Sequence, residues 1–132
     1  MIRQGERSWL FSSPPVITGT GTVVGPDEGE GPLAADFDLV HPDLEIGQSS
    51  WEKSERVLLE QAADIALQHA NKTKEDIQFF VGGDLMNQIT SNSFTARKLG
   101  IPYLGVFGAC STSMESLALA SLLVASGAAD HA

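Results

Sequence analysis

The sequence has 132 residues, and its 8 Lys and Arg against 17 Asp and Glu give a formal net charge of −9. This acidic balance excludes broad electrostatic adhesion to nucleic acid or to an anionic lipid surface. The single cysteine excludes an intrachain disulfide and a cysteine-rich zinc site. With 42% hydrophobic residues the chain is ordinary for a folded domain. Its one thiol is the feature that needs an explanation.

The first predicted element is a strand over residues 15–25, where β-branched residues alternate with small ones. Gly19 and Gly21 do not complete a dinucleotide-binding fingerprint, because an acidic stretch follows them instead of a helix. That stretch, residues 26–48, holds seven acidic residues and no Lys or Arg. The spacing of a calcium-binding loop is missing, so we expect a solvated surface loop and no metal site.

The rest of the chain alternates between helical and extended patterns. Helices are predicted over residues 50–70, 92–99 and 112–126, and strands over residues 77–82 and 103–108. Ser49 with Glu52 gives the first helix a capping-box signature. The alternation predicts an α/β fold in which the strands at 15–25, 77–82 and 103–108 are parallel neighbours.

The chain offers no candidate for a membrane-spanning helix or a signal peptide. The longest apolar tract, Leu117 to Ala129, is shorter than the roughly 20 apolar residues that a bilayer requires. Pro14 and Pro15 break the short apolar run near the N-terminus. We therefore expect a cytoplasmic type of fold without a signal peptide.

Cys110 lies just ahead of the last predicted helix, after a strand that ends at two small residues, Gly108 and Ala109. Thr112 and Glu115 repeat the capping-box spacing, so the sequence predicts a sharp turn that resembles a nucleophile elbow in its mechanics. Unpaired N–H groups at a helix start favour a thiolate or a carboxylate ligand. A small, inert hydrophobic residue is the competing interpretation of the cysteine.

Three strings in the chain carry a family resemblance. They are Thr-Gly-Thr-Gly-Thr-Val-Val-Gly-Pro from residue 18, Val-Gly-Gly-Asp-Leu-Met-Asn-Gln from residue 81, and Phe-Gly-Ala-Cys-Ser-Thr-Ser-Met-Glu-Ser-Leu from residue 107. Together they resemble the stage V sporulation protein AD family, a thiolase-like family of spore-forming bacteria. The resemblance covers essentially the whole chain. It implies the N-terminal half of a thiolase-like fold, with a parallel-rich sheet and a cysteine elbow before a buried helix.

The resemblance also sets expectations for organisation and function. Residues 1–132 are expected to be an N-terminal thiolase-like domain, truncated before the second half of the fold. Members of the family take part in moving dipicolinic acid, with calcium, into the developing spore, and associate with membrane channel proteins of the same operon. A peripheral place on the spore inner membrane and a homodimer are expected on the same ground. By position, Cys110 takes the place of the thiolase nucleophile, and the expected ligand-binding residues are Cys110, Asp84, Asn87 and Ser111.

Two other functions stay open. The runner-up is an acyltransferase or condensing enzyme in which Cys110 accepts the acyl group, and the third is a structural subunit whose thiol only packs. Catalysis requires general-base partners, and His41, His69 and His131 lie in no recognisable catalytic motif. The residues therefore favour binding over catalysis, and neither a cofactor nor a nucleic-acid partner is expected.

Overall fold

The computed structural model describes residues 1–86 and 89–132. Its helices are α1 (Pro26–Gly29), α2 (Trp51–His69), α3 (Thr90–Leu99) and α4 (Thr112–Ala125), with the 3₁₀ turns η1 (Ala34–Asp36), η2 (Lys74–Asp76) and η3 (Ala109–Ser111). Its strands are β1 (Ile2–Gln4), β2 (Ser8–Leu10), β3 (Val23–Val24), β4 (Leu39–Val40), β5 (Phe80–Gly82) and β6 (Tyr103–Gly105). The predicted α/β class is confirmed.

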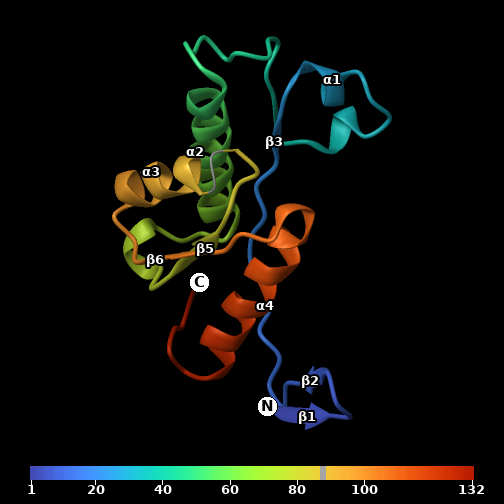
Figure 1. Cartoon of the computed structure of the whole chain (residues 1–132), viewed down its shortest axis with the longest axis vertical. Coiled ribbons are helices and arrows are strands. Elements are labelled where there is room, and N and C mark those ends of the chain that lie inside the picture. The colour runs from blue at the N-terminus through green and yellow to red at the C-terminus, as the bar shows by residue number, and fades with distance from the viewer. Residues whose placement is uncertain (87–88) are drawn as a thin grey trace.

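The strands form small paired units rather than one continuous sheet (Figure 1). β5 and β6 pair in parallel, with Phe80 opposite Tyr103, and α3 makes the connection between them. The rings of Phe80 and Tyr103 stack with their centroids 5.4 Å apart. This β5–α3–β6 unit confirms the predicted parallel pairing of the second and third strands.

The predicted strand at 15–25 is wrong in length and in partner. Only β3 forms there, and it pairs in parallel with β4 instead of with β5. The residues before β3 lie against α2, where the backbone of Gly21 approaches the carbonyl oxygen of Ala62 so closely that a Cβ would not fit. The glycines therefore allow contact with a helix, and the extended segment does not enter a sheet ladder.

The acidic stretch at 26–48 is more ordered than the predicted surface loop. It contains α1, η1 and β4, and β4 begins directly after Asp38, which forms hydrogen bonds with Thr22. The backbone N–H and the hydroxyl of Thr22 both donate to Asp38 Oδ2 at 2.8 Å, and the N–H of Asp38 donates back to the Thr22 hydroxyl at 3.0 Å. These bonds bring the segment back to β3.

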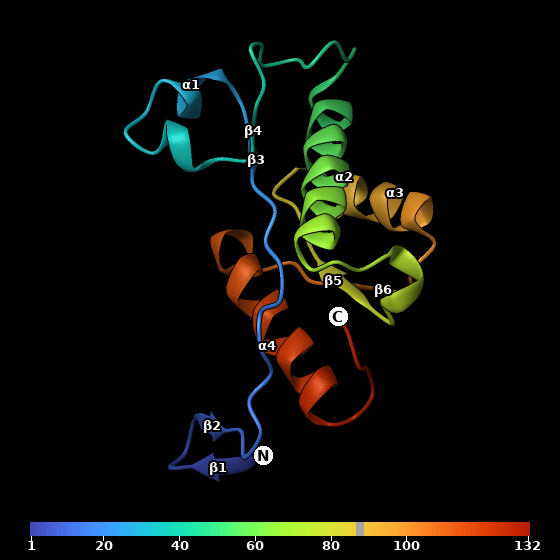
Figure 2. The ribbon, with the colours of Figure 1, turned by 180° about the vertical axis from the view of Figure 1, so that it is seen from behind.

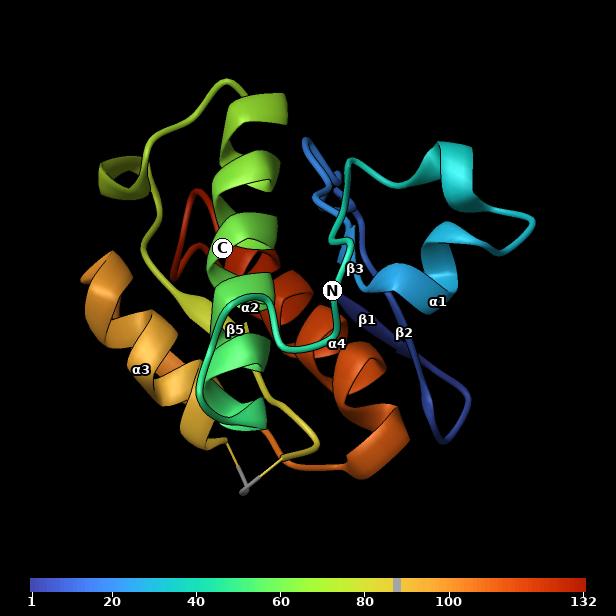
Figure 3. The same ribbon diagram turned by 90° about the horizontal axis from the view of Figure 1, so that it is seen from above.

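The helix predicted at 50–70 is confirmed as α2, but its cap is displaced by one residue. Ser50 is the N-cap, and its hydroxyl accepts from the backbone N–H of Lys53 at 3.4 Å. The hydroxyl of Ser49 accepts instead from the side chain of Lys53 at 2.8 Å, so the capping box predicted with Ser49 is wrong. Seen from above, α2 lies between α3 and the β3 segment (Figure 3).

α2 and α3 are joined by polar contacts as well as by packing. The ammonium group of Lys98 on α3 donates to Glu60 on α2 at 2.6 Å, and Glu60 also pairs with Arg56 at 3.4 Å. The hydroxyl of Ser91 donates to the carbonyl oxygen of Glu52 at 3.2 Å. α3 is also the most buried helix, because five of its ten residues are buried. The helix predicted at 92–99 is thus confirmed, beginning two residues earlier.

The first ten residues form a β-hairpin that the sequence did not predict. β1 and β2 pair antiparallel around a turn in which Gly5 has φ +66°. The hairpin stands apart from the other elements at one end of the molecule, where Trp9 is 53% exposed (Figure 2). Two three-residue strands give too short a pattern for a confident strand prediction.

α4 is confirmed as a helix, and its apolar side chains are exposed or half-buried in the described chain, while the burial that the resemblance implies for it in the whole fold stays a prediction. Thr112 is its one buried residue, whereas Met114 is 63% and Leu117 is 44% exposed. The physical reason is that one side of α4 meets β5, and no layer of the described residues covers its outer face. No helix within residues 1–86 and 89–132 is long and apolar enough to cross a bilayer.

Candidate functional site

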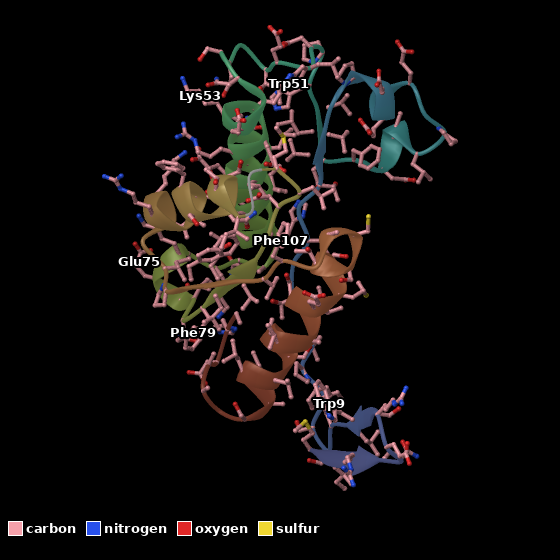
Figure 4. The ribbon with its side chains drawn as sticks, viewed as in Figure 1. Trp9, Trp51, Lys53, Glu75, Phe79 and Phe107 are labelled. Atoms are coloured by element: carbon pink, nitrogen blue, oxygen red, sulfur yellow. The ribbon has the colours of Figure 1, made fainter. Side chains whose placement is uncertain are left out.

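Cys110 is positioned by a tight connection between β6 and α4. Phe107 lies in this connection (Figure 4), and Gly108 leads into η3, whose middle residue is Cys110. Ala109 has φ +49°, in the left-handed region that non-glycine residues rarely occupy. The predicted elbow thus exists as a single 3₁₀ turn that is entered through a strained residue.

The polar side chains around the turn differ from the predicted capping box. Thr112 is the first residue of α4 and not its N-cap, and its hydroxyl accepts from the backbone N–H of Gly108 at 3.1 Å. The hydroxyl of Ser111 lies 2.6 Å from both the carbonyl oxygen of Gly108 and Glu115 Oε1. Ser111 is the N-cap but makes no side-chain cap bond to the helix. The first turn of α4 is therefore left without a side-chain acceptor from its N-cap.

A cavity of about 440 Å³ lies beside this turn, between α2, β5 and the start of α4. Cys110 and Asp84 both line it. The wall is completed by small and apolar residues and a few hydroxyl groups: Leu59, Ala62, Ala63, Phe80, Val81, Gly82, Gly83, Leu85, Asn92, Ala109, Thr112, Ser113 and Ser116. Such a lining suits a small, partly apolar ligand with a few polar groups.

Asp84 follows β5 and is only 5% exposed. Its Oδ1 accepts from the backbone N–H of Ile89 at 3.0 Å, and its Oδ2 accepts from the backbone N–H and the side-chain amide of Asn92 at 2.9 and 3.0 Å. These donors belong to the start of α3, where the helix dipole also favours a negative charge. The carboxylate of Asp84 therefore organises the loop before α3 as well as lining the cavity.

Two ionisable groups near Asp84 have shifted pKa values. Burial raises the pKa of the Glu55 carboxyl group, a hydrogen bond with Ser91 opposes this shift, and the charge of Asp84 adds to it. Burial also raises the pKa of Tyr103 to about 12, with a smaller contribution from Asp84. The hydroxyl of Tyr103 donates to the carbonyl oxygen of Gly82 at 3.0 Å. The charge of Asp84 thus adds to the shifts of both neighbouring groups.

The other expected site residues have different surroundings. Ser111 lies next to Cys110, but its hydroxyl is directed to Gly108 and Glu115. Asn87 lies outside the described residues. Sequence reasoning missed Asn92 and Glu55, because the partners of each come from a different part of the chain. An amide in the first turn of the helix that follows Asp84 is the one signal that points to Asn92.

The histidines are placed away from the cavity. His41 Nε2 lies 2.6 Å from Gln61 Oε1, and His69 Nδ1 lies 2.8 Å from the carbonyl oxygen of Thr20. None of the described residues that line the cavity is a histidine. Within the described ranges, no group of three His, Cys, Asp or Glu side chains is arranged to hold a metal ion.

Comparisons with known proteins agree on one family. The family model described as Stage V sporulation protein AD (SpoVAD) matches residues 5–132. The chain is also similar to a curated protein of Bacillus subtilis (strain 168), stage V sporulation protein AD, with 46% identity over 128 residues. The match covers 97% of this chain and 38% of that relative, so the chain spans well under half of the relative's length.

Proposed function

The chain belongs to the stage V sporulation protein AD family, and on this premise we propose that it serves sporulation by binding dipicolinic acid in the cavity beside Cys110. The observation that carries the proposal is the place of this cavity. It reaches the first turn of a 14-residue helix whose N-cap makes no side-chain bond to the helix. The backbone N–H of Thr112 donates to the carbonyl oxygen of Ala109 in η3, so the proposal places one carboxylate at the backbone N–H groups that follow Thr112 in the first turn of α4.

The chemistry of the lining supports the same ligand. Dipicolinate is a flat pyridine ring that carries two carboxylate groups. Leu59, Ala62 and Phe80 offer apolar surface to the ring, while Ser113 and the start of α4 offer hydrogen-bond donors to one carboxylate. The thiol of Cys110 lies at the turn between these two parts of the lining.

Asp84 and Ser111 take shaping roles in this proposal rather than direct ones. The hydrogen bonds from Ile89 and Asn92 compensate the charge of Asp84, so it does not need a separate cation to remain in the cavity wall. Calcium, in this proposal, accompanies the ligand. A direct contact from Asn87 stays a prediction, because that residue lies outside the described ranges.

The remaining parts of the proposal derive from the resemblance. We propose that the whole protein has a thiolase-like fold, that residues 1–132 form its N-terminal part, and that the protein is a homodimer. It would transfer dipicolinate to membrane channel proteins of the same operon at the spore inner membrane. An acyltransferase that uses Cys110 is less well supported, because the described lining of the cavity supplies no histidine as a general base.

The test is calorimetric titration of the purified protein with dipicolinate, with and without calcium. Cys110→Trp should fill the cavity and abolish binding, whereas Cys110→Ala should keep it, because the thiol is not consumed. Leu33→Trp is the matched control, since Leu33 is exposed and does not line the cavity. Unchanged binding by folded Cys110→Trp protein would place the ligand elsewhere. A stable acyl adduct on Cys110, detected by mass spectrometry after incubation with an acyl thioester, would favour the acyltransferase.

A further inference from the structure

The turn that carries Cys110 is in contact with an acidic side chain from the following helix. Glu115 lies in the first turn of α4, and its Oε1 is 2.6 Å from the hydroxyl of Ser111. The same carboxylate lies directly over Gly108, where even a Cβ would collide with Oε1. The side chain of Glu115 therefore reaches back past the helix start to the residues on both sides of Cys110.

Further hydrogen bonds at the turn involve the same Ser111 hydroxyl that contacts Glu115. The hydroxyl of Ser111 shares its single hydrogen between Glu115 and the carbonyl oxygen of Gly108, which also accepts from the backbone N–H of Ser111 at 3.0 Å. Ala109, between them, is held at φ +49°. A residue in this sparsely populated region persists only where its surroundings fix it. The side chains of Thr112, Ser111 and Glu115 all contact Gly108, and Glu115 with Ser111 is the pair that connects Gly108 to the residue after Cys110.

We propose that Glu115 is a positioning residue for the cavity: acting through Ser111 and Gly108, it holds η3 in the conformation that places Cys110 at the cavity wall. The part that concerns the ligand depends on the proposed function, whereas the part that concerns the turn does not. A merely structural role is the alternative, in which the negative charge only complements the dipole of α4. The two roles differ in what the side chain must supply, a hydrogen-bond acceptor or a charge.

Substitutions of Glu115 and Ser111 distinguish the role of Glu115 as a hydrogen-bond acceptor from its role as a negative charge. Glu115→Gln removes the charge but keeps an oxygen that accepts from Ser111, whereas Glu115→Ala removes both. Ser111→Ala removes the donor and leaves the carboxylate in place. Met114→Ala is the matched control, because Met114 is an exposed neighbour in the same turn of α4. Helix content by circular dichroism reports folding for each variant.

Two readouts keep this inference distinct from the proposed function. The first is the dissociation constant for dipicolinate, and the second is the rate at which iodoacetamide alkylates Cys110, the only cysteine in the chain. We expect Glu115→Gln to bind dipicolinate as the unsubstituted protein does, within about threefold. Glu115→Ala and Ser111→Ala should each weaken binding about tenfold, which is the loss expected for one hydrogen bond to a charged group. The double variant should be no weaker than either single one.

The alkylation rate should separate Glu115→Ala from Glu115→Gln by several-fold, since only the former frees the turn. Equal rates for these two variants would leave a charge effect alone and overturn the inference. Additive effects of Glu115→Ala and Ser111→Ala would overturn it as well. If Glu115→Ala does not fold, Ser111→Ala tests the same bond with a smaller change. If the unsubstituted protein does not bind dipicolinate, the proposed function fails, and the alkylation rates still decide the role of Glu115.

Discussion

Replacing Asp84 with asparagine tests the claim that its buried carboxylate organises the start of α3. Within the described part of the chain, the two oxygens of Asp84 accept three hydrogen bonds, from Ile89 and Asn92. Asparagine has one acceptor oxygen, so its amide group must face at least one of these donors. A buried donor without an acceptor costs about 1–3 kcal/mol, and two donors that face each other add to this cost. We therefore expect Asp84→Asn to lower the free energy of unfolding by about 2–4 kcal/mol.

The assay is equilibrium unfolding in urea, followed by tryptophan fluorescence and by circular dichroism. Asp64→Asn is the matched control, because Asp64 is an exposed residue of α2 and its substitution should stay within about 0.5 kcal/mol of the unsubstituted protein. The slope of the free energy against urea concentration should be the same for all three proteins. Equal stability of Asp84→Asn and Asp64→Asn would refute the reasoning.

Three further predictions concern packing and pH. Gly21→Ala should lower the melting temperature by several degrees, since the new Cβ would collide with the Ala62 carbonyl oxygen. Hydrogen bonds from the backbone and side chain of Thr22 lower the pKa of Asp38 below 3.8. The Asp38 carboxylate therefore stabilises the fold above about pH 4, and this contribution is lost as the pH falls through the folded-state pKa. Asp38→Asn should reduce the loss of folding stability at acidic pH. Tyr103, the only tyrosine, should ionise at a pKa of about 12 in the folded protein, as followed by absorbance at high pH. Because the pKa of unfolded Tyr103 is near 10.0, folding stability should fall between about pH 10 and pH 12.

Each of these predictions has a clear contrary outcome. An unchanged melting temperature for Gly21→Ala would mean that α2 and the preceding segment do not touch as described. If the free energy of unfolding falls equally at acidic pH with and without Asp38, the acid sensitivity belongs to other carboxyl groups. A tyrosine that ionises near pH 10 in the folded state would mean that Tyr103 is hydrated and not held against Gly82.

The elements that the sequence predicted best are those whose characteristic pattern lies within their own residues. α2 has apolar residues at helical spacing, α4 is rich in Ala and Leu, and β5 and β6 are short apolar runs on either side of a helix. These signals suffice because each element carries its own pattern. The strand at 15–25 failed for the opposite reason. Its alternation of small residues fits a strand, but the glycines meet the backbone of α2, a partner about 40 residues away that no local pattern reveals.

The sequence predicted the candidate site only in part. The sharp turn at Cys110 was predicted from the small residues ahead of a helix, whereas the roles of Cys110 and Asp84 came from the resemblance and stay predictions. The bonding of each polar group did not follow, because capping-box spacing does not decide which residue begins the helix. Thr112 begins α4 and accepts from Gly108, while Glu115 reaches Ser111. The hydrogen bonds of Asn92 to Asp84 depend on the position of α3 beside the loop after β5, which no local sequence pattern predicts.

The most direct test of the account is a crystal structure of the protein grown with dipicolinate. The account predicts a flat ring in the cavity between Cys110 and Asp84, with one carboxylate at the backbone N–H groups of the first turn of α4. Ligand density at another place, together with an empty cavity beside Cys110, would contradict it.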